Sequence, residues 1–330
     1  MQLRQLEYFV AVASTRHFTQ AASAVHVAQP SLSNQIRSLE RELGAPLFNR
    51  ARGNITLTAA GETLLPLATR ILADVESARV QVRELVGLAR GELRLGATPT
   101  LSTVLLPAAL QRFCGIYPGI DIFVEERGSR DLVQLLAQGQ LDLALVVLPL
   151  HTRDPALTTA ALFKEPLIVA APADGSIVRA RTLRVRDLAH LPLVMLRDGY
   201  DMREVVLTAM RRERIEPQVA IEGGELDAVL SFVEAGLGIA VVPSMVVESR
   251  PRLRRITFVR PGMSRTVGLA HRRDVEPSAS AQAFRSVLHD HLAEEARSGT
   301  LPRGVEIVAH RFEVERRRPR GGGDRPFATE

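Results

Sequence analysis

The stretch Gln29-Pro30-Ser31-Leu32-Ser33-Asn34-Gln35-Ile36-Arg37-Ser38-Leu39-Glu40 predicts a short helix with one apolar edge and one polar face. Leu32, Ile36, Leu39 and Leu43 are spaced 4, 3 and 4 residues apart, so they share one side and can pack inward. Pro30 suits a first helical position, and Gly44 suits the end of the helix. The remaining face offers serine, asparagine, glutamine and arginine. These side chains suit a helix that reads base edges in the major groove of DNA.

Two further short helices are predicted directly before this one. Apolar residues recur at helical spacing from Leu3 to Ala13 and from Phe18 to Val25, with Thr15 or His17 near the start of the second helix. Alanines in the second helix allow close crossing, and the turn at 26–28 leads into the polar-faced helix. Two short helices joined by a tight turn form a helix-turn-helix.

A β-hairpin is predicted next, with strands at Leu47–Arg50 and Ile55–Thr58 around the turn Arg52-Gly53-Asn54. As a wing beside the helix-turn-helix, it would bring Arg50 and Arg52 near phosphates or the minor groove. The net charge of +5 and the pI of about 10.2 fit a nucleic-acid partner. Nearly all the basic residues are arginine, a bias that a G+C-rich genome would also produce.

A long helix is predicted after Thr58, because apolar residues follow a strict 4-3-4-3 spacing from Leu64 to Leu85. Such a seam favours pairing with a second copy of the helix, although it would also suit a helix that covers its own domain. Pro66 lies early in the pattern and permits a kink. Gly87 and Gly91 are expected to end this long helix.

From Gly91 onward, strand patterns alternate with helix patterns in two groups, which predicts two α/β lobes with largely parallel sheets. The expected strands are Glu92–Ala97, Ile120–Glu125, Leu141–Val147, Leu167–Ala171, Leu193–Leu196, Val219–Ile221, Ile239–Val242, Leu253–Val259 and Thr266–Leu269. The expected helices are Thr103–Tyr117, Leu132–Gln138, Met202–Arg214, Leu226–Ala235 and Ala279–Leu292. Chain crossings near Pro149–Leu162 and Arg260–Met263 would act as hinges.

Together these motifs resemble the LysR-type transcriptional regulators. The similar stretches before the lobes are Leu6–Ala13, Phe18–Ala22, Val27–Ser33, Leu39–Arg50 and Leu57–Gly61; those within the lobes are Gly91–Ala97, Leu105–Pro107, Tyr117–Pro118, Gly139–Ala144 and Val233–Pro243. The resemblance covers residues 1 to 295. It implies a homodimer or homotetramer that binds double-stranded promoter DNA, and whose hold on DNA is changed by a small effector between the two lobes.

The expected fold class is a mainly α N-terminal winged helix-turn-helix, a long linker helix, and a C-terminal α/β two-lobed effector domain like that of periplasmic binding proteins. The domains are expected at 1–58 for DNA binding, 59–89 for the linker and 90–296 for the effector domain. Lobe one would take about 90–162 and 264–296, and lobe two about 163–263. The basic tail at 297–330, with Arg316–Gly323, is expected to be disordered.

The resemblance also implies which residues contact DNA. They are Gln29, Pro30, Ser31, Ser33, Asn34 and Arg37 on the helix, with Arg50 and Arg52 in the wing. Their chemistry agrees with this role, because Gln and Asn can read adenine edges and Arg can read guanine. Any one of them would also be at home as a solvated surface residue.

The effector site is expected after the first strand of lobe one. There Thr98, Thr100 and Ser102 enter a helix, and their hydroxyls with the free N–H groups suit an anion such as a carboxylate. Ordinary helix capping by one hydroxyl is the alternative. Ser129 would add a donor from lobe one, and Tyr200 and Arg203 would close from lobe two. Arg203 suits a structural salt bridge equally well. The Gly223-Gly224-Glu225 turn is a weaker candidate.

Other classes of protein fit the residues less well. No nucleophile elbow, phosphate-binding glycine loop or metal-type histidine spacing appears, so no catalytic residue, metal or cofactor is expected. The single cysteine, Cys114, excludes an internal disulfide and is expected to be a buried thiol. A free solute-binding protein would carry a signal sequence and lack the first ninety residues. Without such a signal or a membrane span, a cytoplasmic location is expected.

Overall fold

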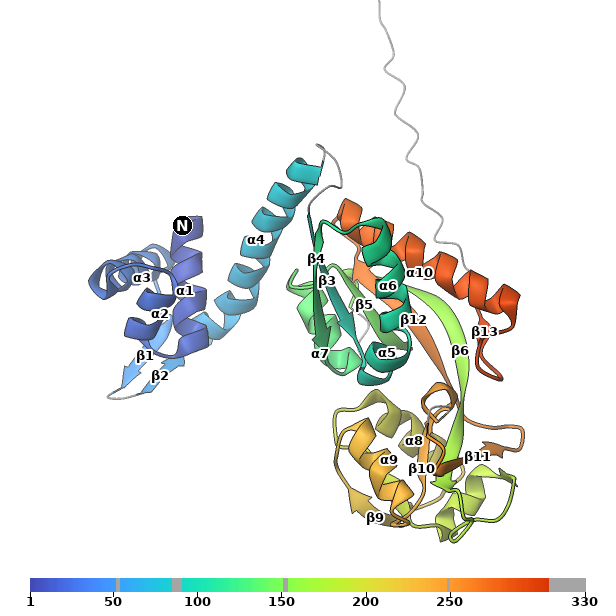
Figure 1. Ribbon diagram of the computed structural model, residues 1–330. Coiled ribbons are helices and arrows are strands. Elements are labelled where there is room, and N and C mark those ends of the chain that lie inside the picture. Colours follow the sequence, from blue (N-terminus) through green and yellow to red (C-terminus); the bar gives the residue numbers. More distant parts are fainter. Residues whose placement is uncertain (52–53, 85–90, 151–153, 248–249, 309–330) are drawn as a thin grey trace, which may run out of the picture.

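The computed structural model describes residues 1–51, 54–84, 91–150, 154–247 and 250–308 (Figure 1). The predicted seam residue Leu85 and the wing residue Arg52 lie outside these ranges. A small N-terminal domain and a two-lobed C-terminal domain are joined by one long helix, which Figure 1 shows between them.

The N-terminal domain is the predicted winged helix-turn-helix. Its elements are α1 (Leu3–Thr15), α2 (Phe18–Ala24), α3 (Gln29–Leu43), β1 (Phe48–Ala51) and β2 (Asn54–Leu57), the last two antiparallel. Leu32, Ile36 and Leu39 of α3 are fully buried with Phe9, as the spacing predicted. Leu43 is instead 42% exposed, because α3 ends there and Gly44 takes up a left-handed φ of 70°.

The linker helix α4 (Ala59–Glu84) serves two partners along its length. Leu64, Ala68 and Ile71 pack against the winged domain's own core, so this part of the seam covers its own domain. Further along, Asp74 pairs with Arg272, at the end of strand β12 (Ser264–Arg272) of lobe one, and Arg70 pairs with Asp274. Near its end Val82 is 65% exposed. The helix therefore connects the two domains through side-chain contacts as well as through the chain.

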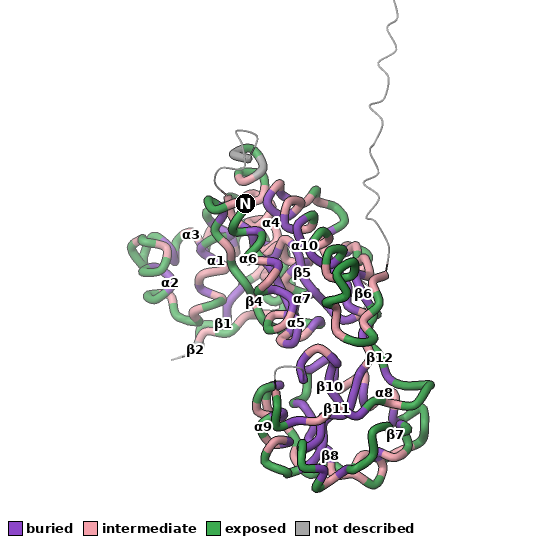
Figure 2. The backbone as a smooth tube through the Cα atoms, turned by 45° about the vertical axis from the view of Figure 1, so that its right-hand side comes forward, coloured by how far each residue is buried: buried purple, intermediate pink, exposed green. Residues whose placement is uncertain are grey.

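The C-terminal domain contains the two predicted lobes (Figure 1). Lobe one has β3 (Gly91–Ala97), α5 (Pro99–Val104), α6 (Leu106–Ile116), β4 (Ile120–Glu126), α7 (Ser129–Ala137), β5 (Leu143–Leu148), β12 (Ser264–Arg272) and α10 (Ala279–Ser298). Lobe two has β7 (Thr182–Leu183), η1 (Val185–His190), β8 (Leu193–Met195), α8 (Asp201–Arg212), β9 (Val219–Glu222), α9 (Leu226–Glu234), β10 (Ala240–Pro243), η2 (Ser244–Val246) and β11 (Leu253–Phe258). Figure 2 shows the buried backbone gathered separately within each lobe.

One long strand, β6 (Leu157–Pro172), belongs to both lobes. Its first part pairs with β12 up to Pro166, and from Leu167 it pairs with β10 and then β11. The first crossing therefore lies at Pro166 and not at Pro149–Leu162 as expected. The second crossing, between Phe258 and Ser264, agrees with the prediction.

The sheets are mixed, which corrects the expectation of largely parallel sheets. β3 is parallel to β4 and β5, and β8 is parallel to β9. β12 is antiparallel to β5 and β6, and β10 and β11 are antiparallel to β6. The strands that cross between the lobes run in opposite directions, and this reverses the local pairing.

Two further expectations about local structure are wrong. The single helix expected at Thr103–Tyr117 is two helices, α5 and α6, that meet at Leu105. Cys114 is exposed, because the buried side of α6 is made by Leu106, Ala109 and Phe113. Cys114 follows Phe113 directly, about 100° further round the helix, and so faces outward.

The chain after residue 297 also departs in part from the disordered tail expected there. Helix α10 continues to Ser298, and β13 (Glu306–Ile307) then pairs with Lys164 and Phe163 of β6. The amide of Val308 donates to Leu162 O at 2.9 Å. Residues 299–308 are therefore an ordered strap along the crossing strand. In the described ranges, no helix combines the length and apolar character that crossing a bilayer requires.

Candidate functional site

The face of α3 opposite the core is exposed along the helix, and it includes the predicted DNA-contact residues. Gln29, Pro30, Ser31, Asn34 and Arg37 are all exposed, while the opposite edge of the helix is in the core. Ser33 is only 8% exposed, so the expectation that it offers its side chain to DNA is corrected. Ser33 directly follows the fully buried Leu32, and that register turns it toward the domain.

Contacts at its neighbours hold α3 in place. The Nδ1 atom of His17 accepts from the amides of Thr19 and Gln20 at the start of α2, at 3.2 and 3.4 Å. His17, and not Thr15, is therefore the residue that caps the start of α2. At the other end, Glu40 accepts from the amide of Leu47 at 2.9 Å, which ties α3 to the wing.

Arg50 lies on β1 of the wing, opposite Ile55 of β2, and contacts α3 through its side chain. Its guanidinium pairs with the Glu40 carboxylate at 3.0 Å and stacks over the Phe18 ring, 5.1 Å from the centroid. Its side chain remains 37% exposed. Arg50 is thus oriented by both α2 and α3, although Glu40 offsets part of its charge. Arg52 lies outside the described residues.

In lobe one, the predicted hydroxyls gather where β3 runs into α5. Thr98 is 4% exposed and Thr100 is 2% exposed. Within the described residues, the hydroxyls of Thr98 and Ser102 are buried and have no hydrogen-bond partner. Thr98 is the N-cap residue of α5 but its side chain makes no capping bond, so the alternative of ordinary capping does not account for these hydroxyls.

The hydroxyl of Thr100 is bound to a buried cation. Arg265, from β12, donates to Thr100 Oγ1 at 2.7 Å and pairs with Glu165 of β6 at 2.8 Å. The side chains of Arg265 and Glu165 are 1% and 0% exposed. The other oxygen of Glu165 accepts from the amide of Met245 at 2.8 Å and from Ser244 Oγ at 3.3 Å.

This cluster joins both crossing strands to α5 of lobe one and η2 of lobe two. The Arg265 guanidinium donates to Glu165 and Thr100, and the Glu165 carboxylate also accepts from Ser244 and Met245. Thr100 therefore has a partner, while Thr98 and Ser102 beside it have hydroxyls without one among the described residues. A buried cation bound to Thr100 thus lies at the crossing between the lobes, and the residues two positions before and after Thr100 have buried hydroxyls without a partner among the described residues.

The two lobes also touch directly at Ser129. Its amide donates to the carboxylate of Asp201, at the start of α8, at 2.9 Å, and this contact is buried. The neighbouring Gly128 approaches Gly199 so closely that a Cβ at 128 would lie 2.7 Å from Gly199 O. Ser129 Oγ accepts from the amide of Val147 at 2.9 Å. Ser129 is therefore an inter-lobe contact through its backbone.

The two residues expected to close from lobe two make contacts within that lobe. Tyr200 is 5% exposed, and its hydroxyl donates to the Glu225 carboxylate. Arg203 donates to Leu196 O at 3.0 Å and pairs with Glu222. Arg203 thus forms a structural salt bridge, which was the alternative to an effector contact in the sequence analysis. The Gly223-Gly224 turn ends at Glu225, the same partner that holds Tyr200.

Sequence reasoning missed Glu165, Arg265 and Asp201. Strand alternation contained a signal for the first two. Residues Arg265, Val267 and Leu269 share the buried face of β12, and Glu165 shares a face with Phe163 and Leu167 on β6. One charge of each sign on the buried face of two strands indicates a buried pair. Nothing local marked Asp201 as a contact between the lobes.

A winged helix-turn-helix joined by a long helix to two hinged α/β lobes defines a ligand-responsive DNA-binding regulator. A family model described as "Bacterial regulatory helix-turn-helix protein, lysR family" matches residues 3–62, and one described as "LysR substrate binding domain" matches residues 87–293. The chain therefore belongs to the LysR family of transcriptional regulators.

Relatives and solved structures match over most of their length. The transcriptional dual regulator GltC of Bacillus subtilis is 32% identical over 286 residues, covering 86% of this chain and 95% of GltC. OxyR of Escherichia coli is 30% identical over 275 residues, 82% of this chain and 90% of OxyR. A full-length OxyR variant from Pseudomonas aeruginosa, at 29% identity, superposes with a TM-score of 0.67, covering 88% of this chain and 94% of that one. Full-length CbnR in complex with its target DNA, at 25% identity, gives 0.64, covering 88% and 99%.

Proposed function

We propose that this regulator binds promoter DNA as a homo-oligomer and that a small organic anion between its lobes changes that binding. The observation that carries the proposal is the buried Arg265 cation beside the hydroxyls of Thr98 and Ser102, which have no partner among the described residues. The domain division at 1–58, 59–89 and 90–296 is retained, with residues 297–308 added to the effector domain. No catalytic step is part of the proposal, and the protein acts where the chromosome is, in the cytoplasm.

The proposed DNA contacts are the exposed residues of α3 with the arginines of the wing. They are Gln29, Pro30, Ser31, Asn34, Arg37, Arg50 and Arg52. The exposure of the first five supports this set, as does the likeness to CbnR bound to its target DNA. The polar side chains supply base-edge contacts, and the arginines add phosphate or guanine contacts.

The proposed effector is a carboxylate or a similar small anion. Its negative group would lie beside Thr98, Thr100 and Ser102, where the charge of Arg265 is partly offset by Glu165. A hydroxyl that is buried without a partner costs free energy, and a bound ligand oxygen would remove that cost. Because the group lies at the crossing strands, its occupancy would favour one angle between the lobes.

The proposed homo-oligomer uses the edge of lobe one. Strand β4 ends the sheet order and leaves one row of backbone groups unpaired within the described sheet. Its Phe123 and Val124 are 57% and 44% exposed, and Ile116 at the end of α6 is 59% exposed. A second copy could cover these apolar groups, and the exposed end of α4 at Val82 offers a further contact.

Peroxide sensing by an internal disulfide is not part of the proposal. Several relatives are named as hydrogen peroxide-inducible genes activators. This chain has one cysteine, exposed on α6, so two of its own thiols cannot be joined. The inter-lobe group is instead made of hydroxyls and a buried ion pair.

The DNA arm of the proposal is tested by fluorescence anisotropy with the intergenic fragment upstream of the adjacent divergent gene. The wild type is expected to prefer this fragment to random DNA and to lose affinity as salt rises. Arg37→Gln should weaken specific binding by about 5- to 150-fold, the value of one base contact. Arg186→Gln removes an exposed arginine of lobe two and should leave binding unchanged. Equal affinity for random DNA would refute this arm.

The effector arm is tested with a thermal-shift screen of small organic acids, followed by calorimetry on the hits. Thr100→Val keeps the shape of the side chain and removes the hydroxyl that Arg265 holds. It is expected to weaken binding of a hit by about tenfold or more. If the affinity of every hit is unchanged in Thr100→Val, the inter-lobe site is wrong.

A further inference from the structure

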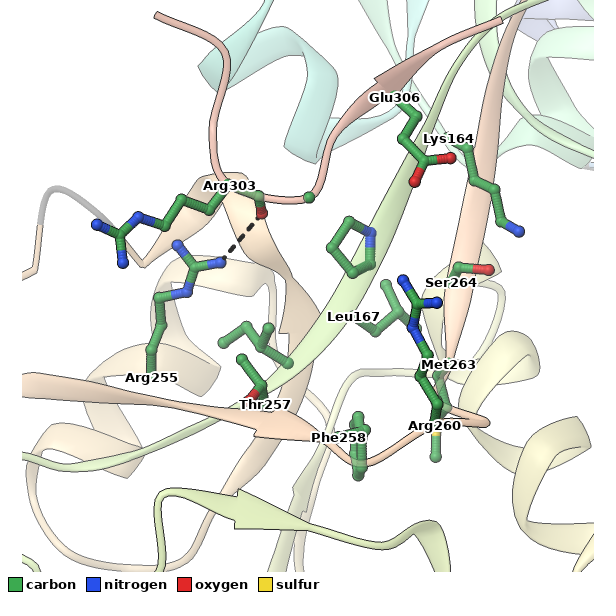
Figure 3. A pocket seen from close by; sticks show the side chains of 14 residues that line it. Lys164, Leu167, Arg255, Thr257, Phe258, Arg260, Met263, Ser264, Arg303 and Glu306 are labelled. Atoms are coloured by element: carbon green, nitrogen blue, oxygen red, sulfur yellow. Dashed lines mark hydrogen bonds between the residues drawn. The ribbon is translucent and has the colours of Figure 1, made fainter. Parts of the chain in front are cut away.

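A hollow lies where the strap at 299–308 returns to the crossing strand β6 (Figure 3). It has a volume of about 820 Å³, within the range of small-molecule sites. In Figure 1, β13 lies on the side of β6 away from α5, so this hollow is separate from the hydroxyls of the effector site. The matched family domain ends at residue 293, so the strap lies beyond the part of the chain that the family model covers.

The rim of the hollow is strongly basic. Lys164, Arg255, Arg260 and Arg303 line it together with one carboxylate, Glu306. These residues come from four separate segments, β6, β11, the second crossing and the strap. Figure 3 shows Arg255 and Arg303 on one side of the hollow, with the Arg303 side chain extending outward, and Arg260 and Lys164 on the other side. Gathering like charges raises the local positive potential, and an anion would lower it.

Most of these charges are not neutralised by a salt bridge in the described ranges. Within the part of the chain that the structure describes, the side chains of Lys164, Arg260 and Arg303 form no ion pair. Arg255 donates to Arg303 O at 3.4 Å, which fixes the strap next to β11. Lys164 and Glu306 are cross-strand neighbours in the β6–β13 pairing. The rim thus keeps available cationic groups on an ordered backbone.

The floor of the hollow is apolar. Pro166, Leu167, Met263 and Phe258 line it. Figure 3 shows Leu167 and Phe258 between Arg255 and Arg260. The strap is seated tightly on this floor, because a Cβ at Gly304 would lie 2.9 Å from Pro166 Cγ. Its φ of 88° is also one that favours glycine. A basic rim over an apolar floor matches an organic anion with an apolar body.

We propose that this hollow is a second binding site, for a small organic dianion whose charged groups are phosphate or carboxylate. Arginine side chains bind either group through paired N–H donors, and Lys164 adds a point charge. A ligand here would touch β11 of lobe two and both crossing strands at once. Its occupancy would therefore bias the hinge from the side opposite the effector site. Only this last consequence rests on the proposed function.

The site is tested by calorimetry on the full chain with phenyl phosphate and with phthalate, at constant ionic strength. Benzyl alcohol is the neutral control. Saturable binding of either dianion, without binding of the alcohol, is the expected result. The two probes show whether phosphate or paired carboxylates are preferred. Absence of saturation with both dianions overturns the proposal.

Four variants locate the binding. Arg260→Gln and Arg303→Gln are each expected to weaken binding by about tenfold or more, and both residues are exposed, so folding is preserved. Arg186→Gln removes the same charge elsewhere in lobe two and should have no effect. Thr100→Val should also have no effect. If Thr100→Val abolishes binding, the probe binds between the lobes and not in this hollow. If all the arginine variants lose the same affinity, the probe is held by general charge attraction. Either result refutes this site and leaves the effector proposal standing.

Discussion

The variant Glu165→Leu should destabilise the effector domain severely. Glu165 is 0% exposed and accepts from Arg265, Ser244 and the amide of Met245. Its loss leaves a buried guanidinium with Thr100 as its remaining partner in the cluster. Arginine keeps its charge in proteins, so the variant leaves a buried cation without its counter-charge.

The size of the effect follows from the burial of the pair. Breaking one partner of a buried ion pair costs about 3–5 kcal/mol, a large share of the roughly 5–15 kcal/mol that keeps a domain folded. For a domain of about 200 residues each kcal/mol shifts the Tm by roughly 2–4 °C, so a fall of about 6–20 °C is expected. The double variant Glu165→Leu/Arg265→Met replaces both charges with apolar groups and should recover most of this loss.

Differential scanning calorimetry of the full chain measures this directly. Circular dichroism is the second readout, because the chain has no tryptophan to report unfolding by fluorescence. The control is Glu294→Leu, which breaks the exposed pair with Arg112 and should leave the Tm nearly unchanged. If Glu165→Leu behaves like this control, or if the double variant is as unstable as the single one, the buried pair does not hold the lobes together.

Three further outcomes follow from particular contacts. Phe123→Glu on β4 should weaken self-association in analytical ultracentrifugation by burying a charge in an apolar interface, whereas Val219→Glu, at a 39% exposed position of lobe two, should not. Asp74→Asn should loosen α4 from lobe one and speed hydrogen exchange of the α4 amides. In the described ranges Arg272 pairs with Asp74 and Asp274, and the variant leaves it only Asp274. Unchanged exchange would contradict the contact between α4 and lobe one. Burial lowers the pKa of His271 and of His289 below their ordinary value of 6.5. The unfolded chain therefore takes up protons first as the pH falls, so stability is full above about 6.5 and declines below it. The fall in Tm from pH 7.5 to 5.5 should be smaller in the double glutamine variant of these histidines.

Hydrophobic spacing and turn residues predicted the winged domain and most of the helices and strands of the two lobes. The spacing of Leu32, Ile36 and Leu39, 4 and then 3 residues, placed α3 correctly, because a helix that must bury one edge repeats its apolar residues with its own period. Gly44 ended that helix as predicted, since the left-handed φ it adopts is costly for other residues. These are local rules, and they hold wherever the helix packs.

Local rules failed where a long-range neighbour decided the outcome. The pattern from Leu64 to Leu85 did not show which partner each turn of α4 meets, and its first part covers the winged domain. The strap at 299–308 contains two glycines and a proline and shows no regular spacing, yet it is ordered by pairing with β6 and by Val305 and Ile307, which pack against the core of lobe one. Spacing reports that a surface is apolar or polar, but not which other segment reaches it.

The candidate sites divide in the same way. The exposed residues of α3 were readable from the sequence, because one helix contains them all. The pair of Glu165 and Arg265 lies 100 residues apart along the chain, and the basic hollow draws its charges from four segments. Only the tertiary structure brings such groups together, since the two strands that cross between the lobes run in opposite directions and return distant residues to one place.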